Sequence, residues 1–332
     1  MTADHRTAGR RSGGAPAKHA TTTQPQSDQR PPAIDVTGLT KRFGRHVAVD
    51  DLSMTVPTGA ITGFVGPNGA GKTTTLRMLV GLVRPSAGTG TVLGEPLSEP
   101  HRYLHRVGAL IESPAFYPSL TARQNLRFLA RLDGVDPHRV DEALSTVGLT
   151  SRGDDAYRTY SLGMKQRLGI AAALLPQPDL LLLDEPANGL DPAGIRGIRE
   201  LLTRLAASGT TILVASHLLA EVEALCSWMV LLHRGKRVYQ GAVDALGADD
   251  RGRLVVRTVD PAHLSVVQDV AAEHGFTATR NGDRLIIDSP ADFAGTLNAE
   301  VIRRGAVIRE LAVESTTLEQ RFFAVTGEET TP

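Results

Sequence analysis

Hydrophobic and polar positions follow one another in two ways along this chain, one typical of strands and one typical of helices. The pattern becomes strand-like at Ile34–Val36 and alternates over Ala48–Val56. Helical spacing of apolar residues runs over 120–147, with a break near Gly134–Asp136, and returns over Ile195–Ala207. Strands that alternate with helices predict an α/β fold with a mostly parallel sheet.

Four short runs are almost wholly apolar, and we predict that they are strands of this sheet. A strand covered by helices on both faces loses the alternation because neither face meets water. The runs are Ala60–Val65, Asp179–Leu183, Thr211–Ala215 and Met229–Leu232. None approaches the roughly 18 apolar residues that a membrane-spanning helix needs, so we expect any membrane role to come through a partner.

A glycine-rich loop, Gly66–Thr74, follows the first of these runs, and a helix is predicted over Thr73–Leu82. The loop has the pattern Gly, four residues, Gly-Lys-Thr. Glycines adopt positive φ angles at little cost and let backbone N–H groups approach a ligand, so this loop can cradle phosphate oxygens. We expect Lys72 to neutralise the β- and γ-phosphates of a nucleotide, and the hydroxyl of Thr73 to complete a Mg²⁺ shell.

A chance match to this pattern is disfavoured, because the chain has 33 glycines but only five lysines. The order of strand, loop and helix is also the one that a phosphate-binding loop requires. We therefore predict that nucleotide is bound by Gly66, Pro67, Asn68, Gly69, Ala70, Gly71, Lys72, Thr73 and Thr74.

Two acids, Asp184 and Glu185, end the apolar run of residues 180–183. Many strands end in solvated acids, so on its own this is weak evidence. Buried carboxylates are costly unless they face a cation or a hydrogen-bond partner, and Lys72 offers such a context. We expect Asp184 to hold Mg²⁺, directly or through water, and Glu185 to act as general base toward the attacking water.

A second candidate anion site begins at Ser161, which is expected to cap a helix that continues through Ala173. The Ser161 hydroxyl and the Gly163 N–H at a helix N-terminus can bind an anion. Taken alone, this segment is better explained as an ordinary capped helix.

Taken together, these motifs resemble those of the ATP-binding subunit of an ABC transporter, over about residues 34–240. The resemblance implies a P-loop NTPase fold with a RecA-like core and a helical subdomain. It also implies that Phe43 stacks on adenine and that His217 senses the γ-phosphate. The matching segments are Gly66–Thr74 for Walker A, Leu180–Glu185 for Walker B, Ser161–Gly163 for the signature, Asn188–Asp191 for the D-loop and Ser216–His217 for the switch.

The resemblance further implies ATP and Mg²⁺ as cofactors and a homodimer arranged head to tail across ATP. Each ATP would lie between Gly66–Thr74 of one copy and Ser161–Gly163 of the other. Hydrolysis by Glu185 with His217 would then open the dimer.

A separate transmembrane permease is the implied partner, which would place the chain in the cytoplasm, peripheral on the inner face of the cell membrane. The segment Ile111–Asn125 would carry motion to that permease. Its aromatic residues Phe116 and Tyr117, if exposed, could receive a short helix of the partner.

The sequence departs from the usual family pattern at two motifs, and these departures resemble one branch of the family. Leu162 and Met164 stand where the signature usually has Gly and Gln, and Glu112 stands at the Q-loop position where Gln is usual. A carboxylate cannot donate a hydrogen bond unless it is protonated, so coupling through that loop can differ. With Phe116–Pro118, both departures resemble the bacitracin- and daunorubicin-resistance exporters, which implies export of a drug or a peptide antibiotic.

The ends of the chain differ from its centre. Residues 1–32 have almost no large apolar side chains and are predicted to be a disordered tail. An ABC domain is expected over 33–245, and a small α+β accessory domain with a βαββαβ, ferredoxin-like order over 246–332. Its expected elements are Leu254–Val259, Pro261–His274, Thr277–Arg280, Arg284–Asp288, Ala291–Arg304, Val307–Val313 and Leu318–Val325.

The composition of the chain further limits the classes of function and site that it can have. Lys+Arg and Asp+Glu both total 36, which gives no argument for nucleic acid as a partner. The single cysteine, Cys226, excludes a disulfide framework or a multi-cysteine zinc site. The alternatives are a soluble ABC ATPase that acts on ribosomes or DNA, and a regulator with a ligand-sensing C-terminal unit. The first is disfavoured by a single phosphate loop without zinc cysteines or a long coiled coil.

Overall fold

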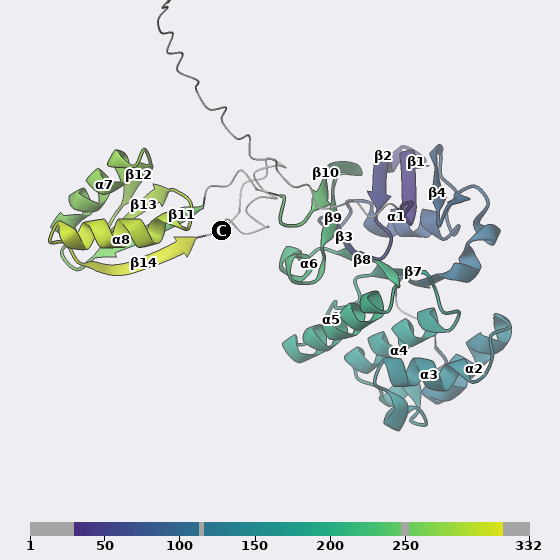
Figure 1. Cartoon of the computed structure of the whole chain (residues 1–332). Helices are drawn as coiled ribbons and strands as arrows, with labels where there is room; N and C mark the ends of the chain where they lie inside the picture. Colours follow the sequence, from purple (N-terminus) through teal and green to yellow (C-terminus); the bar gives the residue numbers. More distant parts are fainter. Residues whose placement is uncertain (1–29, 113–115, 247–251, 315–332) are drawn as a thin grey trace, which may run out of the picture. The chain divides into compact units, whose positions relative to one another are not determined.

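The computed structural model describes residues 30–112, 116–246 and 252–314 (Figure 1). Most of the predicted tail, the centre of the predicted linker at Ala245–Gly252 and the helix expected at Leu318–Val325 lie outside these ranges. Within the described residues, no helix is both long and apolar enough to cross a membrane.

A six-stranded sheet with the order β10-β9-β3-β8-β7-β6 forms the centre of residues 31–246. Its five strands from β9 to β6 are parallel, and β10 pairs antiparallel with β9 at one edge. The strands are β3 (Ile61–Val65), β6 (Val107–Leu110), β7 (Leu180–Asp184), β8 (Thr211–Ser216), β9 (Trp228–His233) and β10 (Lys236–Ala242). The apolar runs of the sequence therefore form the middle of the sheet, as expected.

Both faces of this sheet are buried, which explains why its strands lack alternation. Leu181 and Leu183 of β7 belong to a core shared with α2 to α6, whereas Leu180 and Leu182 belong to a second core on the other face. That second core includes α1 and a small antiparallel sheet. The covering helices of the central region are α1 (Lys72–Leu79), α5 (Pro192–Ala207) and α6 (Leu219–Leu225).

The small sheet has the order β2-β1-β4-β5. Its strands are β1 (Ile34–Phe43), β2 (His46–Val56), β4 (Ala87–Val92) and β5 (Glu95–Pro96). The predicted strand at Ile34–Val36 was too short, because β1 continues to Phe43. Register shifts after Val36, next to Gly38 with its φ of +65°, break the alternation that the prediction used.

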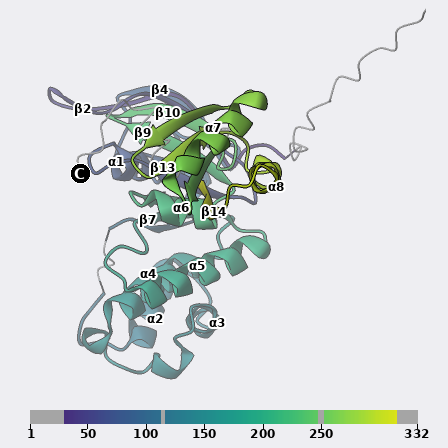
Figure 2. The ribbon, with the colours of Figure 1, turned by 90° about the vertical axis from the view of Figure 1, so that its left-hand side faces the viewer.

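Three helices, α2 (Ala122–Leu132), α3 (Arg139–Thr146) and α4 (Leu162–Leu174), gather away from the small sheet in both Figure 1 and Figure 2. Thr121 and Gln124 form a capping box at the start of α2, and Gly134 turns the chain after it with a φ of +66°. The break expected near Gly134–Asp136 is therefore present. Short 3₁₀ turns lie at Pro100–Arg102, Leu104–Arg106, Thr150–Arg152, Tyr157–Thr159 and Pro261–His263.

Residues 252–314 form a separate sheet covered by two helices, and we describe this unit by itself. Its elements are β11 (Arg253–Thr258), α7 (Leu264–Glu273), β12 (Thr277–Asn281), β13 (Arg284–Asp288), α8 (Phe293–Arg303) and β14 (Ile308–Glu314). The sheet is antiparallel, with the order β12-β13-β11-β14. Leu254, Val256, Leu285 and Ile287 meet the helices in one core.

Candidate active site

The phosphate loop connects the end of β3 to the start of α1, as its sequence predicts. Two of its glycines have no room for a side chain. A Cβ on Gly66 would lie 2.4 Å from the carbonyl oxygen of Leu232, and one on Gly71 would lie 2.5 Å from that of Ala48. Gly71 also has a φ of +104°, which side-chain-bearing residues rarely adopt. The backbones of β9 and β2 therefore pack directly against this loop.

Lys72 is the charged centre of the loop and is only 6% exposed. Its Nζ donates hydrogen bonds to the carbonyl oxygens of Gly66 at 2.6 Å and Pro67 at 3.3 Å. The same atom lies 3.4 Å from Oε1 of Glu185. These partners compensate a buried cation, and they hold it where the loop closes around an anion.

Thr73 and Asp184 meet although 111 residues separate them in sequence. The Thr73 hydroxyl donates to Oδ2 of Asp184 at 2.6 Å, while Oδ1 of Asp184 is buried and has no hydrogen-bond partner in the described part of the chain. Burial raises the pKa of Asp184, and the Thr73 hydrogen bond opposes that rise. A hydroxyl beside an unsatisfied carboxylate oxygen is a donor set that suits Mg²⁺ together with water and phosphate oxygens.

Glu185 and His217 meet because β7 and β8 are parallel neighbours whose carboxyl ends lie at the same edge of the sheet. Nδ1 of His217 lies 2.8 Å from Oε2 of Glu185. Glu185 has a φ of +49°, and its backbone N–H donates to the carbonyl oxygen of Ala215 at 2.9 Å. The neighbouring strand thus holds Glu185 in a left-handed conformation that a residue with a Cβ rarely adopts.

Phe43 lies at the end of β1 and is 50% exposed. Nζ of Lys41 is 4.9 Å from the centre of its ring and also donates to the carbonyl oxygen of Arg84 at 2.8 Å. Lys41 therefore contacts the ring from one side, and the half-exposed residue remains accessible to a stacking partner.

A hollow of about 240 Å³ lies at the phosphate loop and includes two residues that the sequence did not indicate, His46 and Ala48. The remaining lining residues are 68–74 of the loop and Glu185. His46 pairs with Phe43 across the turn between β1 and β2. The short Phe-Gly-Arg-His turn is the signal that could have placed His46 beside the expected adenine site.

The signature and D-loop residues form another cluster, and none of them lines this hollow. The Ser161 hydroxyl caps α4 by accepting from the Met164 N–H at 3.3 Å, and Asp191 caps α5 by accepting from the Gly194 N–H at 2.9 Å. The two segments touch, since a Cβ on Gly189 would lie 3.0 Å from Leu162. Ser161 and Leu162 are exposed, and Gly163 is half-buried.

Glu112, at the Q-loop position, is exposed and forms an ion pair with Arg77 of α1. It has a φ of +66°. Of the two aromatics nearby, Tyr117 is the exposed one: the residue is 53% exposed, and its ring meets that of Phe128 edge-on, with ring centres 5.5 Å apart. Phe116 instead packs against the core and against Tyr157.

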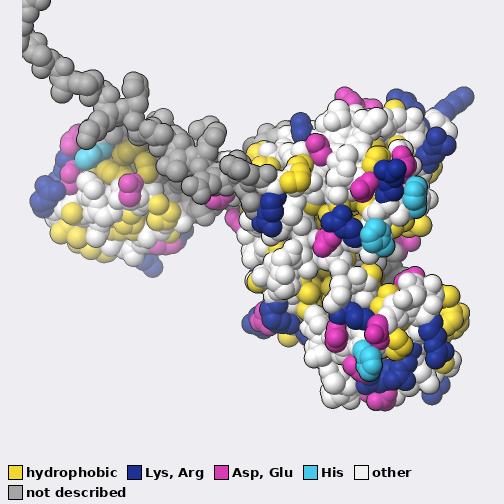
Figure 3. Space-filling model, turned by 45° about the vertical axis from the view of Figure 1, so that its right-hand side comes forward, with side chains coloured by type: hydrophobic (Ala, Val, Ile, Leu, Met, Phe, Trp, Pro, Cys, Tyr) yellow, Lys and Arg dark blue, Asp and Glu magenta, His cyan; other side chains and the backbone are white. Residues whose placement is uncertain are grey.

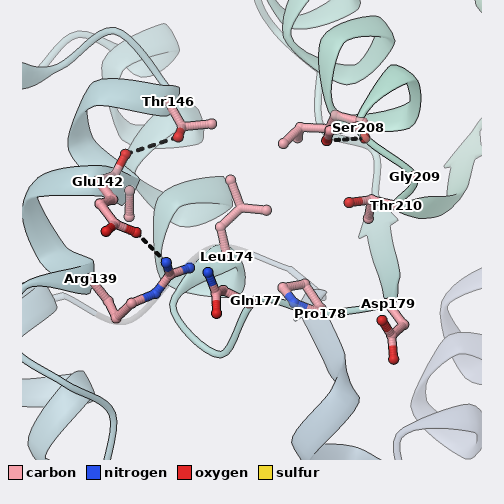
Figure 4. A pocket seen from close by; sticks show the side chains of 12 residues that line it. Arg139, Glu142, Thr146, Leu174, Gln177, Pro178, Asp179, Ser208, Gly209 and Thr210 are labelled. Atoms are coloured by element: carbon pink, nitrogen blue, oxygen red, sulfur yellow. Dashed lines mark hydrogen bonds and ion pairs between the residues drawn. The ribbon is translucent and has the colours of Figure 1, made fainter.

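A separate hollow of about 370 Å³ lies between α3 and the turns that precede β7 and β8 (Figure 4). Arg139 and Glu142 form an ion pair on one side, and Ser208 and Thr210 lie on the other. Since β7 and β8 begin here, this hollow is at the opposite end of these strands from Glu185. It takes no part in the phosphate-loop site.

Known proteins similar to this chain match it over most of its length. The family described as ABC transporter matches residues 49–188. The bacitracin transport ATP-binding protein BcrA of Bacillus licheniformis is 38% identical over 298 residues, which cover 89% of this chain and 97% of that protein. The chain belongs to the family of ABC transporter ATP-binding proteins.

Two further members of this family extend the comparison. The daunorubicin/doxorubicin resistance ATP-binding protein DrrA of Streptomyces peucetius is 33% identical and covers 89% of this chain and 92% of that protein. A solved structure of the ATP-binding subunit of an ABC transporter is 31% identical, with a TM-score of 0.59, over 65% of this chain and 92% of the solved one. The fold is thus that of a P-loop NTPase of ABC type.

As a member of this family, the chain is an ATP-hydrolysing transporter subunit, and membership implies a membrane permease as its partner. On the face that Figure 3 presents, acidic and basic side chains lie interspersed, as the balanced composition leads us to expect.

Proposed function

We propose that the chain hydrolyses ATP to power the export of a drug or a peptide antibiotic through a separate transmembrane permease. Its relatives BcrA and DrrA are named for bacitracin transport and for daunorubicin and doxorubicin resistance. This substrate class agrees with the variant residues Leu162, Met164 and Glu112 of the chain. The partner would hold the chain at the inner, cytoplasmic face of the cell membrane.

The observation that carries the proposed chemistry is the convergence of Lys72, Thr73, Asp184, Glu185 and His217 on the phosphate loop. Lys72 would exchange its two loop carbonyls for phosphate oxygens of ATP. The free N–H groups of residues 66–74 would bind the remaining phosphate oxygens, because the loop points into the hollow and α1 begins there. The exposed Phe43 would stack on adenine.

Thr73 and Asp184 are the residues that would hold Mg²⁺. Their contact leaves one buried carboxylate oxygen unpartnered in the described residues, which an oxygen-seeking cation would satisfy. When bound, Mg²⁺ would neutralise charge that develops on the phosphates.

Glu185 would act as general base, taking a proton from the water that attacks the γ-phosphate. Its contact with His217 supports this role, because the imidazole fixes one carboxylate oxygen and so orients the other. His217 would also donate a hydrogen bond to the γ-phosphate. Release of this phosphate would then break a contact at the end of β8.

A homodimer would complete the site, with Ser161–Gly163 of a second copy closing over ATP. The support is twofold: Ser161 and Leu162 are exposed, and neither lines the hollow that holds the phosphate loop. Asp191 of the adjoining D-loop would lie at the same interface, since its segment touches Leu162.

We further propose three parts in the chain: a tail over 1–32, an ABC domain over 33–245 and an accessory α+β domain over 246–332. Support comes from the solved ATP-binding subunit, which is matched over 92% of its length by 65% of this chain. The remaining third of this chain therefore lies outside the matched domain. The strand order β12-β13-β11-β14 also agrees with a ferredoxin-like unit.

The test combines ATP binding with resistance of cells that express the chain and its permease. Lys72→Ala should weaken ATP binding by about tenfold to a hundredfold, because charge-assisted hydrogen bonds are lost. It should also abolish resistance to bacitracin or daunorubicin. Lys236→Ala, which removes an exposed lysine paired with Asp50, is the matched control. Unchanged ATP affinity in Lys72→Ala would refute the site, and absent resistance in the wild type would refute the substrate class.

A further inference from the structure

His46 occupies a distinct position at the nucleotide site. It lines the same hollow as residues 68–74 of the phosphate loop, and it is the first residue of β2. Its direct partner across the antiparallel pair is Phe43, the last residue of β1. Residues directly opposite each other in such a pair project from the same face, so His46 and Phe43 point to the same side of the hairpin.

A nucleotide has three parts, and two of them already have expected positions in the proposed function. Phe43 would take the base and the loop would take the phosphates. The part that joins base and phosphates is the ribose. His46 is next to Phe43 in the hairpin and next to the loop in the hollow, so the ribose is the part that lies within its reach.

We propose that His46 is a ribose-binding residue, whose ring nitrogens exchange hydrogen bonds with the sugar hydroxyls of ATP. This inference rests on the proposed function and adds a specificity determinant to it. The imidazole is suited to the task, since it offers both a donor and an acceptor when neutral. His46 is exposed, and in the described part of the chain its ring makes no hydrogen bond or ion pair, so it is available to a ligand.

The backbone around His46 is held firmly against the phosphate loop. Ala48, which lines the same hollow, packs its carbonyl oxygen against Gly71. The N–H of Asp50 donates to the carbonyl oxygen of Gly235 at 2.9 Å, and the N–H of Gly235 donates to that of Ala70 at 3.1 Å. These contacts join the start of β2 to the loop, so the backbone that carries His46 lies beside the loop before nucleotide binds.

The experiment compares three ligands that contain different parts of the nucleotide: ATP, 2′,3′-dideoxy-ATP and inorganic tripolyphosphate. Affinities are measured for the full chain and for His46→Ala, with Mg²⁺ and at a temperature where hydrolysis is negligible. We expect the wild type to bind ATP about threefold to tenfold more tightly than dideoxy-ATP, the range for loss of a hydrogen bond. His46→Ala should bind both nucleotides with the weaker affinity and should bind tripolyphosphate like the wild type.

Two further variants sharpen the comparison. His46→Gln keeps a side chain that can donate and accept, so it should recover part of the preference for ATP over dideoxy-ATP. His105→Ala removes an exposed histidine outside the hollow and should leave all three affinities unchanged.

Two results would overturn the assignment. Equal weakening of all three ligands in His46→Ala would mean that His46 contacts phosphate, and wild-type affinities in this variant would mean that it contacts no part of ATP. Neither result touches the proposed function, which instead fails if Lys72→Ala binds tripolyphosphate and ATP as tightly as the wild type.

Discussion

Single residues of the site hold buried charge at a cost to the fold. Lys72 is 6% exposed and Asp184 is 9% exposed, yet one oxygen of Asp184 has no hydrogen-bond partner within the described residues. The backbone of Glu185 is held in a left-handed conformation beside them. Such local departures are typical of functional sites, where a ligand supplies the missing partner.

Glu221 of α6 is a half-buried acid at the edge of this region, and it gives a prediction about stability. Its Oε1 is buried without a hydrogen-bond partner in the described residues. Burial raises its pKa, the Arg199 guanidinium opposes this rise, and the charge of Glu185 adds to it. The native protein therefore keeps the Glu221 proton at pH values where the unfolded chain has released it. The free energy of unfolding should fall as pH rises through that window above 4.5.

Glu221→Gln removes this dependence, so the variant should exceed the wild type in free energy of unfolding at pH 8. The difference should vanish below the unfolded-state pKa. Urea unfolding followed by circular dichroism at both pH values measures it. Glu223→Gln, at an exposed glutamate of the same helix, is the control. A Glu221→Gln variant that is less stable than the wild type at pH 8 would refute this account.

The sequence indicated the site residues that stand inside motifs, and missed one that reaches the hollow through strand pairing. Lys72, Thr73 and Asp184 were found because their neighbours in sequence carry the signal. His46 was not, since its place depends on the register of the hairpin with Phe43. The partial burial of Phe116 could not be predicted either, because it depends on packing against Tyr157 from a distant segment.

Elements shape the site through close packing around the phosphate loop. The start of β2 packs against Gly71. In the turn between β9 and β10, the N–H of Gly235 donates a hydrogen bond to the carbonyl oxygen of Ala70 in the loop. The sequence predicted the strand, loop and helix here. It placed the end of the helix at Leu82, whereas α1 ends at Leu79 and Gly81 follows with a φ of +73°.

Gly71→Ala tests this packing. A Cβ at this position would lie 2.5 Å from the carbonyl oxygen of Ala48, and the φ of +104° adds strain. We expect the free energy of unfolding to fall by about 3 kcal/mol and ATP binding to be lost. Gly69→Ala is the matched control, since Gly69 has a φ of +82° but no atom within 4 Å of the added Cβ. Its loss should be only about 1 kcal/mol. Equal losses in both variants would show that backbone strain, not packing, dominates.

At the scale of the whole molecule, the proposed function depends on partners: a membrane permease and a second copy of the chain. Pattern and motif predicted the α/β core and the helical part of the fold. The order β12-β13-β11-β14 of the C-terminal unit is now known, but its role is not encoded in a motif. Substrate choice is likewise not predicted from these residues, because the proposed site would bind nucleotide and not the exported substrate.

Coupling to the permease is the first prediction at this scale. Tyr117 is exposed at the start of the helical part, and its backbone is held by Asn125 through hydrogen bonds of 2.8 and 3.1 Å. Tyr117→Ala should abolish transport and spare basal ATP hydrolysis, since the exposed ring is lost without disturbing the core. Ile302→Ala, which removes an apolar side chain that is 57% exposed on α8, should affect neither. Intact transport in Tyr117→Ala would remove Tyr117 from the coupling surface.

The central claim is that two copies of the chain bind each ATP between them. The most direct test is the mass in solution of the Glu185→Gln variant with and without Mg-ATP. This variant should lose turnover by at least about a hundredfold while keeping ATP binding, because the general base is removed and the loop is intact. ATP should therefore double its mass, and adding Lys72→Ala should prevent the doubling. A Glu185→Gln chain that stays monomeric when saturated with ATP would contradict the account.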